Sequence, residues 1–83
     1  MRLDKYLKVS RLIKRRTVAN EACDNERVTV NGKVARASYE VKAGDVISIR
    51  FGQRTLTVEV VSVMENAGKA DAAAMYREVA AQG

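Results

Sequence analysis

Histidine is absent from this 83-residue chain, and cysteine occurs once, at Cys23. Without histidine, no Ser-His or Cys-His nucleophilic pair can form, and a single thiol supplies too few soft ligands for a zinc site. One cysteine also excludes an internal disulfide. The P-loop, GxGxxG and HExxH motifs are missing as well. We therefore expect a protein without catalytic residues, metal or cofactor.

Long apolar runs are missing too. None comes near the ~20 residues that a helix needs to cross a bilayer, and no apolar stretch of the secretory type follows the basic N-terminus. A chain of this length forms one small domain with a modest core, which leaves little room for a substrate cleft. We expect a cytoplasmic protein that is not an enzyme, with no membrane partner and no small-molecule substrate.

Positive charge is what the sequence has in excess, and it is concentrated at the N-terminus. Residues 1–17 carry a net charge of +6, whereas the rest of the chain carries −1. Such a one-sided field is the electrostatic footprint of a protein that binds a polyanion. A solvated basic helix face explains it less well, because one acid alone, Asp4, interrupts the basic residues. These basic residues are Arg2, Lys5, Lys8, Arg11, Lys14, Arg15 and Arg16.

The apolar spacing predicts two short helices at the start of the chain. Leu3 and Leu7 lie one turn apart in a helix over residues 3–9. A second helix over about 15–24 has an apolar stripe made of Val18, Ala19, Ala22 and Cys23. A cysteine in such a stripe is interpreted as a small packed core residue. We expect Asn25 to end the second helix in the left-handed conformation.

After Arg27 the apolar residues alternate, which predicts strands. The dipeptide Asn31-Gly32 is the strongest short hairpin signal in the chain. Two further strands are expected over 46–51 and 55–63, with an irregularity near Val61.

A loop and an alanine-rich helix over 69–81 are expected to follow the strands. The expected fold class is α+β, with two N-terminal helices packed on a small twisted antiparallel sheet and a C-terminal helix. We expect one domain over 1–63, followed by the loop and C-terminal helix within 64–83.

Two polar side chains of the first helix admit more than one interpretation. Asp4, near the helix start, interacts favourably with the helix dipole, and it can also orient the guanidinium of Arg2 or Arg16 for phosphate contact. Tyr6 can stack on a base, although packing of its ring at the helix edge is favoured.

The order of several motifs resembles the S-four-type RNA-binding domain, also called the alpha-L motif. The motifs are RLDKYL at the start, RTVA from Arg16, RVTVNG from Arg27, and Ser38, Val41 and Gly44-Asp45. The resemblance covers about residues 1–50, and the combined spacing is highly specific. It implies two helices against a small antiparallel sheet, with structured RNA bound by the basic helix ends and the hairpin loop.

Carried over by position, this resemblance places RNA contacts on part of the basic segment and on the hairpin edge. These residues are Arg2, Lys5, Lys14, Arg15, Arg16, Asn31 and Lys33. With Asp4, Lys8 and Arg11 added from the charge pattern, they form the candidate RNA site.

The chain departs from the family pattern at both ends of its second helix. Arg15 stands where the family commonly has a capping Ser or Thr, so a side-chain N-cap is missing. Glu26 stands where the family favours glycine.

Over nearly the full length, the chain resembles a narrower group, the short RqcP (YabO) family of Gram-positive bacteria. Its distinguishing stretches are LKVSRLIKRRT, Ile49–Gln53 and Ala72–Tyr76. This resemblance implies binding to 23S rRNA and peptidyl-site tRNA on an obstructed large ribosomal subunit. It also implies cooperation with an RqcH-type protein during C-terminal alanine tailing, and we expect a monomer.

Other functions stay open at this point. A more distant resemblance to the small heat-shock ribosome-binding protein of Gram-negative bacteria suggests an rRNA-binding assembly or recycling factor. A protein-interaction module with a basic helix on an acidic partner, and a DNA-binding protein, are further alternatives.

Overall fold

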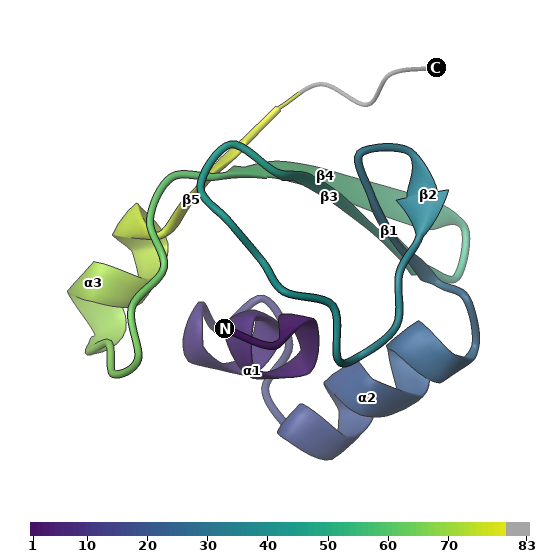
Figure 1. Ribbon diagram of the computed structural model, residues 1–83, viewed down its shortest axis with the longest axis horizontal. Helices are drawn as coiled ribbons and strands as arrows, with labels where there is room; N and C mark the ends of the chain where they lie inside the picture. The colour runs from purple at the N-terminus through teal and green to yellow at the C-terminus, as the bar shows by residue number, and fades with distance from the viewer. Residues whose placement is uncertain (80–83) are drawn as a thin grey trace.

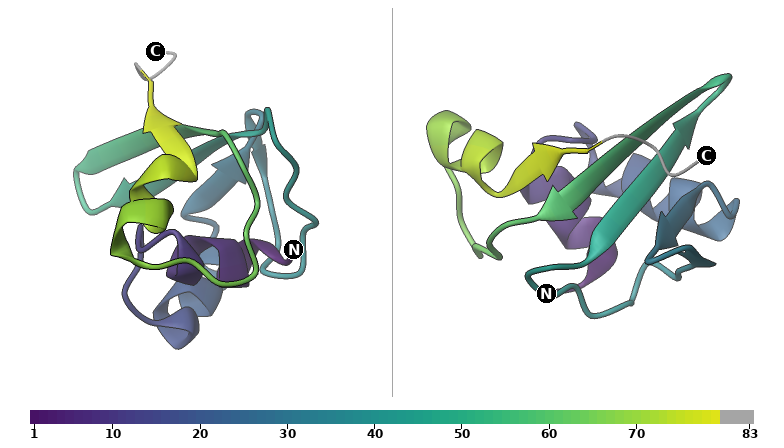
Figure 2. Two further views of the ribbon diagram at one scale, coloured as in Figure 1. Left: turned by 90° about the vertical axis from the view of Figure 1, so that its left-hand side faces the viewer. Right: turned by 90° about the horizontal axis from the view of Figure 1, so that it is seen from above.

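The computed structural model describes residues 1–79. This part of the chain forms three helices, α1 (Leu3–Val9), α2 (Arg16–Asp24) and α3 (Lys69–Ala74). It also forms five strands, β1 (Val28–Val30), β2 (Lys33–Val34), β3 (Val46–Phe51), β4 (Arg54–Val60) and β5 (Tyr76–Glu78). Helices α1 and α2 lie together on one face of the sheet, and α3 lies beside its β5 end (Figures 1 and 2). The α+β prediction is confirmed.

The sheet is antiparallel throughout, in the order β2-β1-β3-β4-β5. Residue alternation sends Ile47 and Ile49 of β3 to the helix-covered face, where neither side chain is exposed. The register pairs Ile47 with Val58, which is also fully buried. On the opposite face, the hydroxyls of Ser48 and Thr57 share a hydrogen bond of 3.0 Å. The core therefore lies between β3–β4 and the helices.

Helix α1 supplies the other side of this core. Leu3, Tyr6 and Leu7 follow the i, i+3, i+4 spacing of one helix face, and none of them is exposed. The Tyr6 hydroxyl donates a buried hydrogen bond of 2.8 Å to the carbonyl of Met75. The packing interpretation of Tyr6 is confirmed, and the bond fixes the C-terminal segment to the first helix.

The C-terminal helix is shorter than predicted. It ends at Ala74, and Tyr76–Glu78 form β5, which pairs with the edge of β4. Met75 is fully buried, and its carbonyl also accepts hydrogen bonds from the amides of Val61 and Ser62. These tertiary contacts outweigh the helix propensity of the alanines. The end of the predicted helix, Ala80 and Ala81, lies outside the described residues.

Strand β4 also ends earlier than predicted, at Val60. The amides of Val61 and Ser62 both bond to one carbonyl instead of continuing the ladder, which confirms the irregularity expected near Val61. Val63, the last residue of the predicted strand, lies outside β4 and is 38% exposed.

Helix α2 differs from the prediction at two positions. Ala19 and Cys23 are buried as expected, but Val18 is 48% exposed. Glu26, not Asn25, takes the left-handed conformation, with φ of 59°. Its amide bonds to the carbonyl of Cys23, and the next amide bonds to Ala22, which is the Schellman arrangement. Glu26 therefore occupies the position that the family fills with glycine.

Candidate nucleic-acid interface

The N-terminal residues, up to the first turn of α1, are held by backbone hydrogen bonds to residues 37–41. The amide of Leu3 donates to the carbonyl of Tyr39 at 2.8 Å, and the amide of Asp4 donates to Ala37 at 3.1 Å. The N-terminal amine pairs with Glu40 at 3.0 Å. These bonds satisfy amides at the start of α1 that no side chain caps. They also fix the backbone of Arg2, the first residue of the candidate site.

Asp4 is the centre of the site. Its side chain is only 3% exposed, yet it accepts hydrogen bonds from both helices. Arg2 Nε lies 3.2 Å from Oδ1, and Arg16 Nε lies 3.4 Å from Oδ2. Asn20 Nδ2 donates to Oδ2 at 3.3 Å, and the amide of Lys5 donates to Oδ1 at 2.8 Å. One carboxylate therefore holds two guanidiniums from separate elements.

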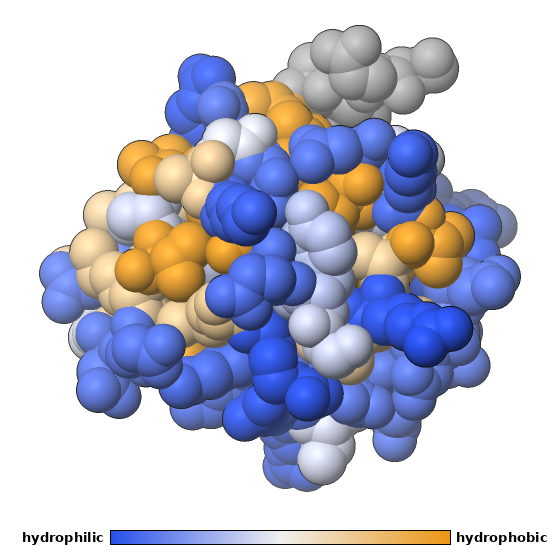
Figure 3. Space-filling model, viewed as in Figure 1, coloured by the Kyte–Doolittle hydropathy of each residue, from blue (hydrophilic) through white to orange (hydrophobic). Residues whose placement is uncertain are grey.

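The two guanidiniums remain available to solvent. The side chains of Arg2 and Arg16 are 50% and 49% exposed, so their outer N–H groups face water while the inner ones bind Asp4. The paired arrangement carries a net charge of about +1, with planar donors suited to phosphate oxygens. In the view of Figure 3, strongly hydrophilic residues gather over the junction of α1 and α2. The structure thus shows Asp4 paired with both arginines, and the contact of these arginines with phosphate stays a prediction.

The environment of Asp4 keeps it ionised. Burial alone raises the pKa of its carboxyl, but the hydrogen bonds from Arg2, Asn20, Arg16 and the Lys5 amide together outweigh burial. The pKa of Asp4 therefore lies below its ordinary value. The negative charge that aligns the arginines is present at neutral pH.

Lys5, a predicted RNA contact, has a partner within the protein. Its ammonium forms a hydrogen-bonded ion pair with Glu65, in the loop before α3. The hydrogen bond and charge of Lys5 lower the pKa of Glu65. RNA that engages Lys5 has to compete with this exposed carboxylate.

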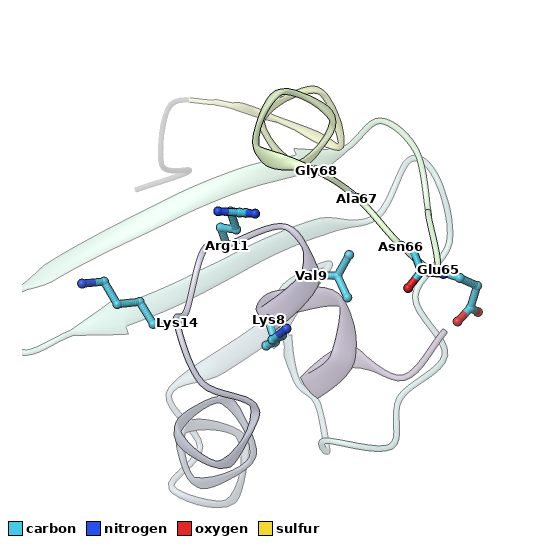
Figure 4. Close-up of a pocket in the computed structure, with 8 residues that line it drawn as sticks. All are labelled: Lys8, Val9, Arg11, Lys14, Glu65, Asn66, Ala67 and Gly68. Atoms are coloured by element: carbon cyan, nitrogen blue, oxygen red, sulfur yellow. The ribbon is translucent and has the colours of Figure 1, made fainter.

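Three other predicted residues line a groove between the end of α1 and the loop before α3. Lys8, Arg11 and Lys14 stand on one side, and residues 65–68 stand on the other (Figure 4). Within residues 1–79, none of these three cations forms an ion pair with an acid. The groove thus extends the positive surface beyond the Asp4 cluster.

Arg11 is held in an unusual backbone conformation. It follows Ser10, the C-cap residue of α1, and has a φ of 64°, in the left-handed region that favours glycine. A side chain there costs roughly 1–2 kcal/mol relative to ordinary helical geometry. Residues in strained conformations often mark functional sites. The chain therefore places a cation beside the groove at some cost in stability.

Arg15 occupies the N-cap position of α2 but does not cap it. Its backbone is extended, and no side-chain hydrogen bond closes the first turn. This confirms the missing cap. Lys14, Arg15 and Arg16 are all exposed at this end of α2, so the Arg15 guanidinium is free to bind an anion at a helix N-terminus.

The hairpin residues have a different environment. Asn31, with φ of 53°, donates through Nδ2 to Asp45 at 3.1 Å and accepts at Oδ1 from the Val46 amide at 2.9 Å. Its amide therefore braces the β1–β2 turn against the start of β3. Lys33 is exposed at the sheet edge. Contact of either residue with RNA stays a prediction.

Two residues of the site were not predicted from the sequence. Asn20 contributes to the Asp4 cluster, and its position one helical turn after Arg16 was an available signal. Glu65 pairs with Lys5 although the two lie 60 positions apart in the sequence, and no local pattern indicates such a pair. Among residues 1–79, no cluster of His, Cys, Asp and Glu can hold a metal, and no helix could span a membrane.

Most of this candidate site lies in the part of the chain that a known family model matches. The S4 domain model covers residues 1–47, which include the Asp4 cluster, both N-terminal helices and the first hairpin. The chain therefore belongs to the S4 domain family.

Proteins that are similar over nearly the whole chain define the family more narrowly. The RQC P-site tRNA stabilizing factor of Halalkalibacterium halodurans is 58% identical over 76 residues, covering 92% of this chain and 86% of that protein. The factor of the same name from Bacillus subtilis is 54% identical over 76 residues, covering 92% and 88%. This chain is a member of their family.

A solved structure has the same fold. Heat Shock Protein 15 of Vibrio cholerae, whose structure is described as trimeric, matches with a TM-score of 0.88 and 32% identity. The match covers 96% of this chain and 82% of that one.

Asp4 should link stability to pH. Because the pKa of folded Asp4 lies below the ordinary value of 3.8, the unfolded chain binds this proton more readily. The stabilisation is complete above the ordinary pKa and is lost as pH falls through the lower folded pKa. We expect Asp4→Asn to lower the free energy of unfolding at neutral pH by about 1–3 kcal/mol, with the difference from wild type shrinking in acid.

Urea unfolding from about pH 2 to pH 7 measures this difference. The exposed Glu78 provides the control, since Glu78→Gln should change the free energy of unfolding by less than about 0.5 kcal/mol. If the free energies of unfolding of wild type and Asp4→Asn differ by the same amount at every pH, the lowered pKa of Asp4 is contradicted.

Arg11→Gly should stabilise the protein and weaken its binding to RNA. Glycine relieves the strain of the left-handed conformation, worth about 1 kcal/mol in the free energy of unfolding, but the groove loses a cation. Glu26→Gly is the matched control, because it relieves a similar strain, at φ of 59°, outside the predicted site. Urea unfolding and filter binding to a duplex RNA probe measure both variants. Equal loss of affinity in the two would rule out a charge effect at Arg11.

Proposed function

We propose that this protein is a non-enzymatic RNA-binding factor of ribosome-associated quality control. It binds the obstructed large ribosomal subunit in the cytoplasm, contacting 23S rRNA and the peptidyl-site tRNA. It thereby supports C-terminal alanine tailing of the stalled nascent chain by an RqcH-type protein. The observation that carries the proposal is the pair of half-exposed guanidiniums held by buried Asp4, in a chain 58% identical to an RQC P-site tRNA stabilizing factor.

The Asp4 cluster supplies the main contact by which the protein binds folded RNA. Double-helical RNA is recognised mainly through shape, phosphates and 2′-hydroxyls, because its deep groove hides the base edges. Arg2 and Arg16 present planar guanidiniums, each of which can donate two parallel hydrogen bonds to a phosphate. Asp4 fixes both guanidiniums before binding, so less side-chain entropy is lost when the phosphate arrives.

The groove cations extend this contact along the RNA backbone. Lys8, Arg11 and Lys14 have no acidic partner within residues 1–79, so each can neutralise a phosphate without first breaking an ion pair. Each neutralised phosphate releases counterions and makes binding more dependent on salt. A protein held this way positions tRNA on the exposed subunit and contributes no chemical step.

A second function, rRNA-binding recycling or assembly after heat shock, has one observation in its favour. The fold matches Heat Shock Protein 15 of Vibrio cholerae with a TM-score of 0.88. The 32% identity of that match is well below the 58% of the quality-control relative, so we rank recycling second.

Arg2→Ala and Arg16→Ala should each abolish stable association with large subunits. Both side chains are half-exposed, so the fold should survive, whereas the two-point phosphate contact is lost. We expect co-sedimentation with large subunits carrying peptidyl-site tRNA to weaken by ten-fold or more, and the salt slope of binding to fall by about 1.

Arg77→Ala is the control for loss of charge. Arg77 is an exposed arginine of β5, paired with Glu59 and outside the predicted site. The Arg77→Ala variant should co-sediment with large subunits as wild type does. Retention of both Arg2→Ala and Arg16→Ala on the subunits at moderate salt would contradict the proposed binding face.

Deletion of the gene should remove alanine-tailed products from cells that carry stalled ribosomes. Tail-specific immunoblotting measures this, and wild type but not Arg16→Ala should restore the signal. Normal tailing in the deletion strain, together with slow recovery of free large subunits after heat stress, would favour the recycling function instead.

A further inference from the structure

The tip of the β3–β4 hairpin carries an exposed aromatic ring that the proposed binding face does not use. Phe51 is the one phenylalanine of the chain, and it is 45% exposed. It follows Ile47 and Ile49 in the strand alternation, so it continues the helix-covered face of the sheet past the end of the core. The two-residue turn Gly52-Gln53 comes next, and Arg54 is the cross-strand partner of Phe51.

Phe51 lies in a groove between the hairpin tip and α2, which we call the hairpin-tip groove. Its apolar lining residues are Phe51, Val18, Ile13, Ala22 and Ile49. Val18 is 48% exposed, so two large apolar side chains face solvent in one depression. A volume of about 330 Å³ is at the lower end for ligand sites, which suits one flat ring system rather than an extended cofactor.

Arginines lie next to this apolar floor. Arg27 and Arg50 line the groove, held next to each other by a backbone hydrogen bond of 2.9 Å, and Arg54 stands opposite Phe51. Within residues 1–79 none of the three forms an ion pair. One acid, Glu21, also lines the groove. The excess charge is positive, as in the N-terminal segment.

This combination points to one kind of occupant. A single exposed apolar side chain is ordinary on a protein surface, but here an aromatic ring and a second apolar residue share a groove with unpaired arginines. An apolar protein partner would leave those guanidiniums buried without counter-charges, which is costly. An unpaired nucleotide supplies both a flat base for the ring and a phosphate for the arginines.

We propose that the hairpin-tip groove binds one unpaired nucleotide of the RNA engaged by the basic face. The base stacks on Phe51, with Val18 at its edge, and the adjoining phosphate pairs with Arg54 and Arg27. The groove neighbours the basic face along the chain, since its lining residues Ile13 and Val18 directly flank residues 14–17. This inference rests on the proposed function and adds to it a contact with a loop or bulge.

Tryptophan fluorescence gives a direct test, because the chain has no tryptophan of its own. The Phe51→Trp variant is titrated with a short mixed-sequence single-stranded RNA and with large subunits carrying peptidyl-site tRNA. Stacking of a base should quench its emission with both. Val63→Trp, which reports from an exposed position beyond the other end of β4, should show no quenching.

Affinities of three further variants complete the test. Phe51→Ala should weaken binding to the subunit–tRNA complex by about ten-fold, as loss of one base stack does, while Phe51→Tyr should keep wild-type affinity. Arg54→Ala should lower the salt slope by about 0.7, the value for one phosphate of a single strand. Urea unfolding confirms that each variant is folded.

The outcomes separate this inference from the proposed function. If wild type binds subunits, Arg16→Ala does not, and Phe51→Ala binds like wild type without quenching in Phe51→Trp, the groove proposal alone is overturned. If wild type fails to bind subunits, the proposed function fails, while quenching by single-stranded RNA still supports the groove. If Phe51→Ala changes self-association in sedimentation velocity but not RNA affinity, the groove is a protein contact and the proposal is wrong.

Discussion

A single buried carboxylate joins the fold of this protein to its binding face. Asp4 lies at the contact of α1 and α2, and it is bonded by Arg2, Arg16 and Asn20. Burying an ion pair usually costs about as much in desolvation as it returns. Here the cost is limited, because the guanidiniums stay half in water while the carboxylate receives donors at both oxygens. The same bonds therefore position α2 against α1 and orient the arginines.

The structure also shows how a +6 segment is tolerated in so small a domain. Like charges in a short segment repel one another and weaken a compact fold. Acids from distant parts of the chain offset this at selected points, with Glu40 on the N-terminal amine and Glu65 on Lys5. The groove cations are left without such partners in the described chain. In the proposed complex, the phosphate backbone would supply the missing counter-charge, so repulsion that weakens the free protein would favour the complex.

Sequence patterns predicted correctly the elements that depend on neighbouring residues. They failed for elements whose structure depends on contacts between distant parts of the chain. The period of Leu3 and Leu7 and the Asn31-Gly32 turn are local signals, and the structure confirms both. The strand after Met75 could not be predicted, since it depends on the Tyr6 hydroxyl and on the free edge of β4. The candidate site followed the same rule. Its cations were visible as a charge run, but the pairing of Lys5 with Glu65 depends on the folded chain.

Helix α2 connects the two surfaces assigned to RNA. Ala19 and Cys23 are buried, and their small side chains suit the close packing of α2 against α1. Arg16 and Asn20 turn to Asp4, while Val18 lies on the hairpin-tip groove. With nine residues and no side-chain cap, α2 has little stability of its own. Its placement therefore depends on Asp4, and both proposed RNA contacts depend on that placement.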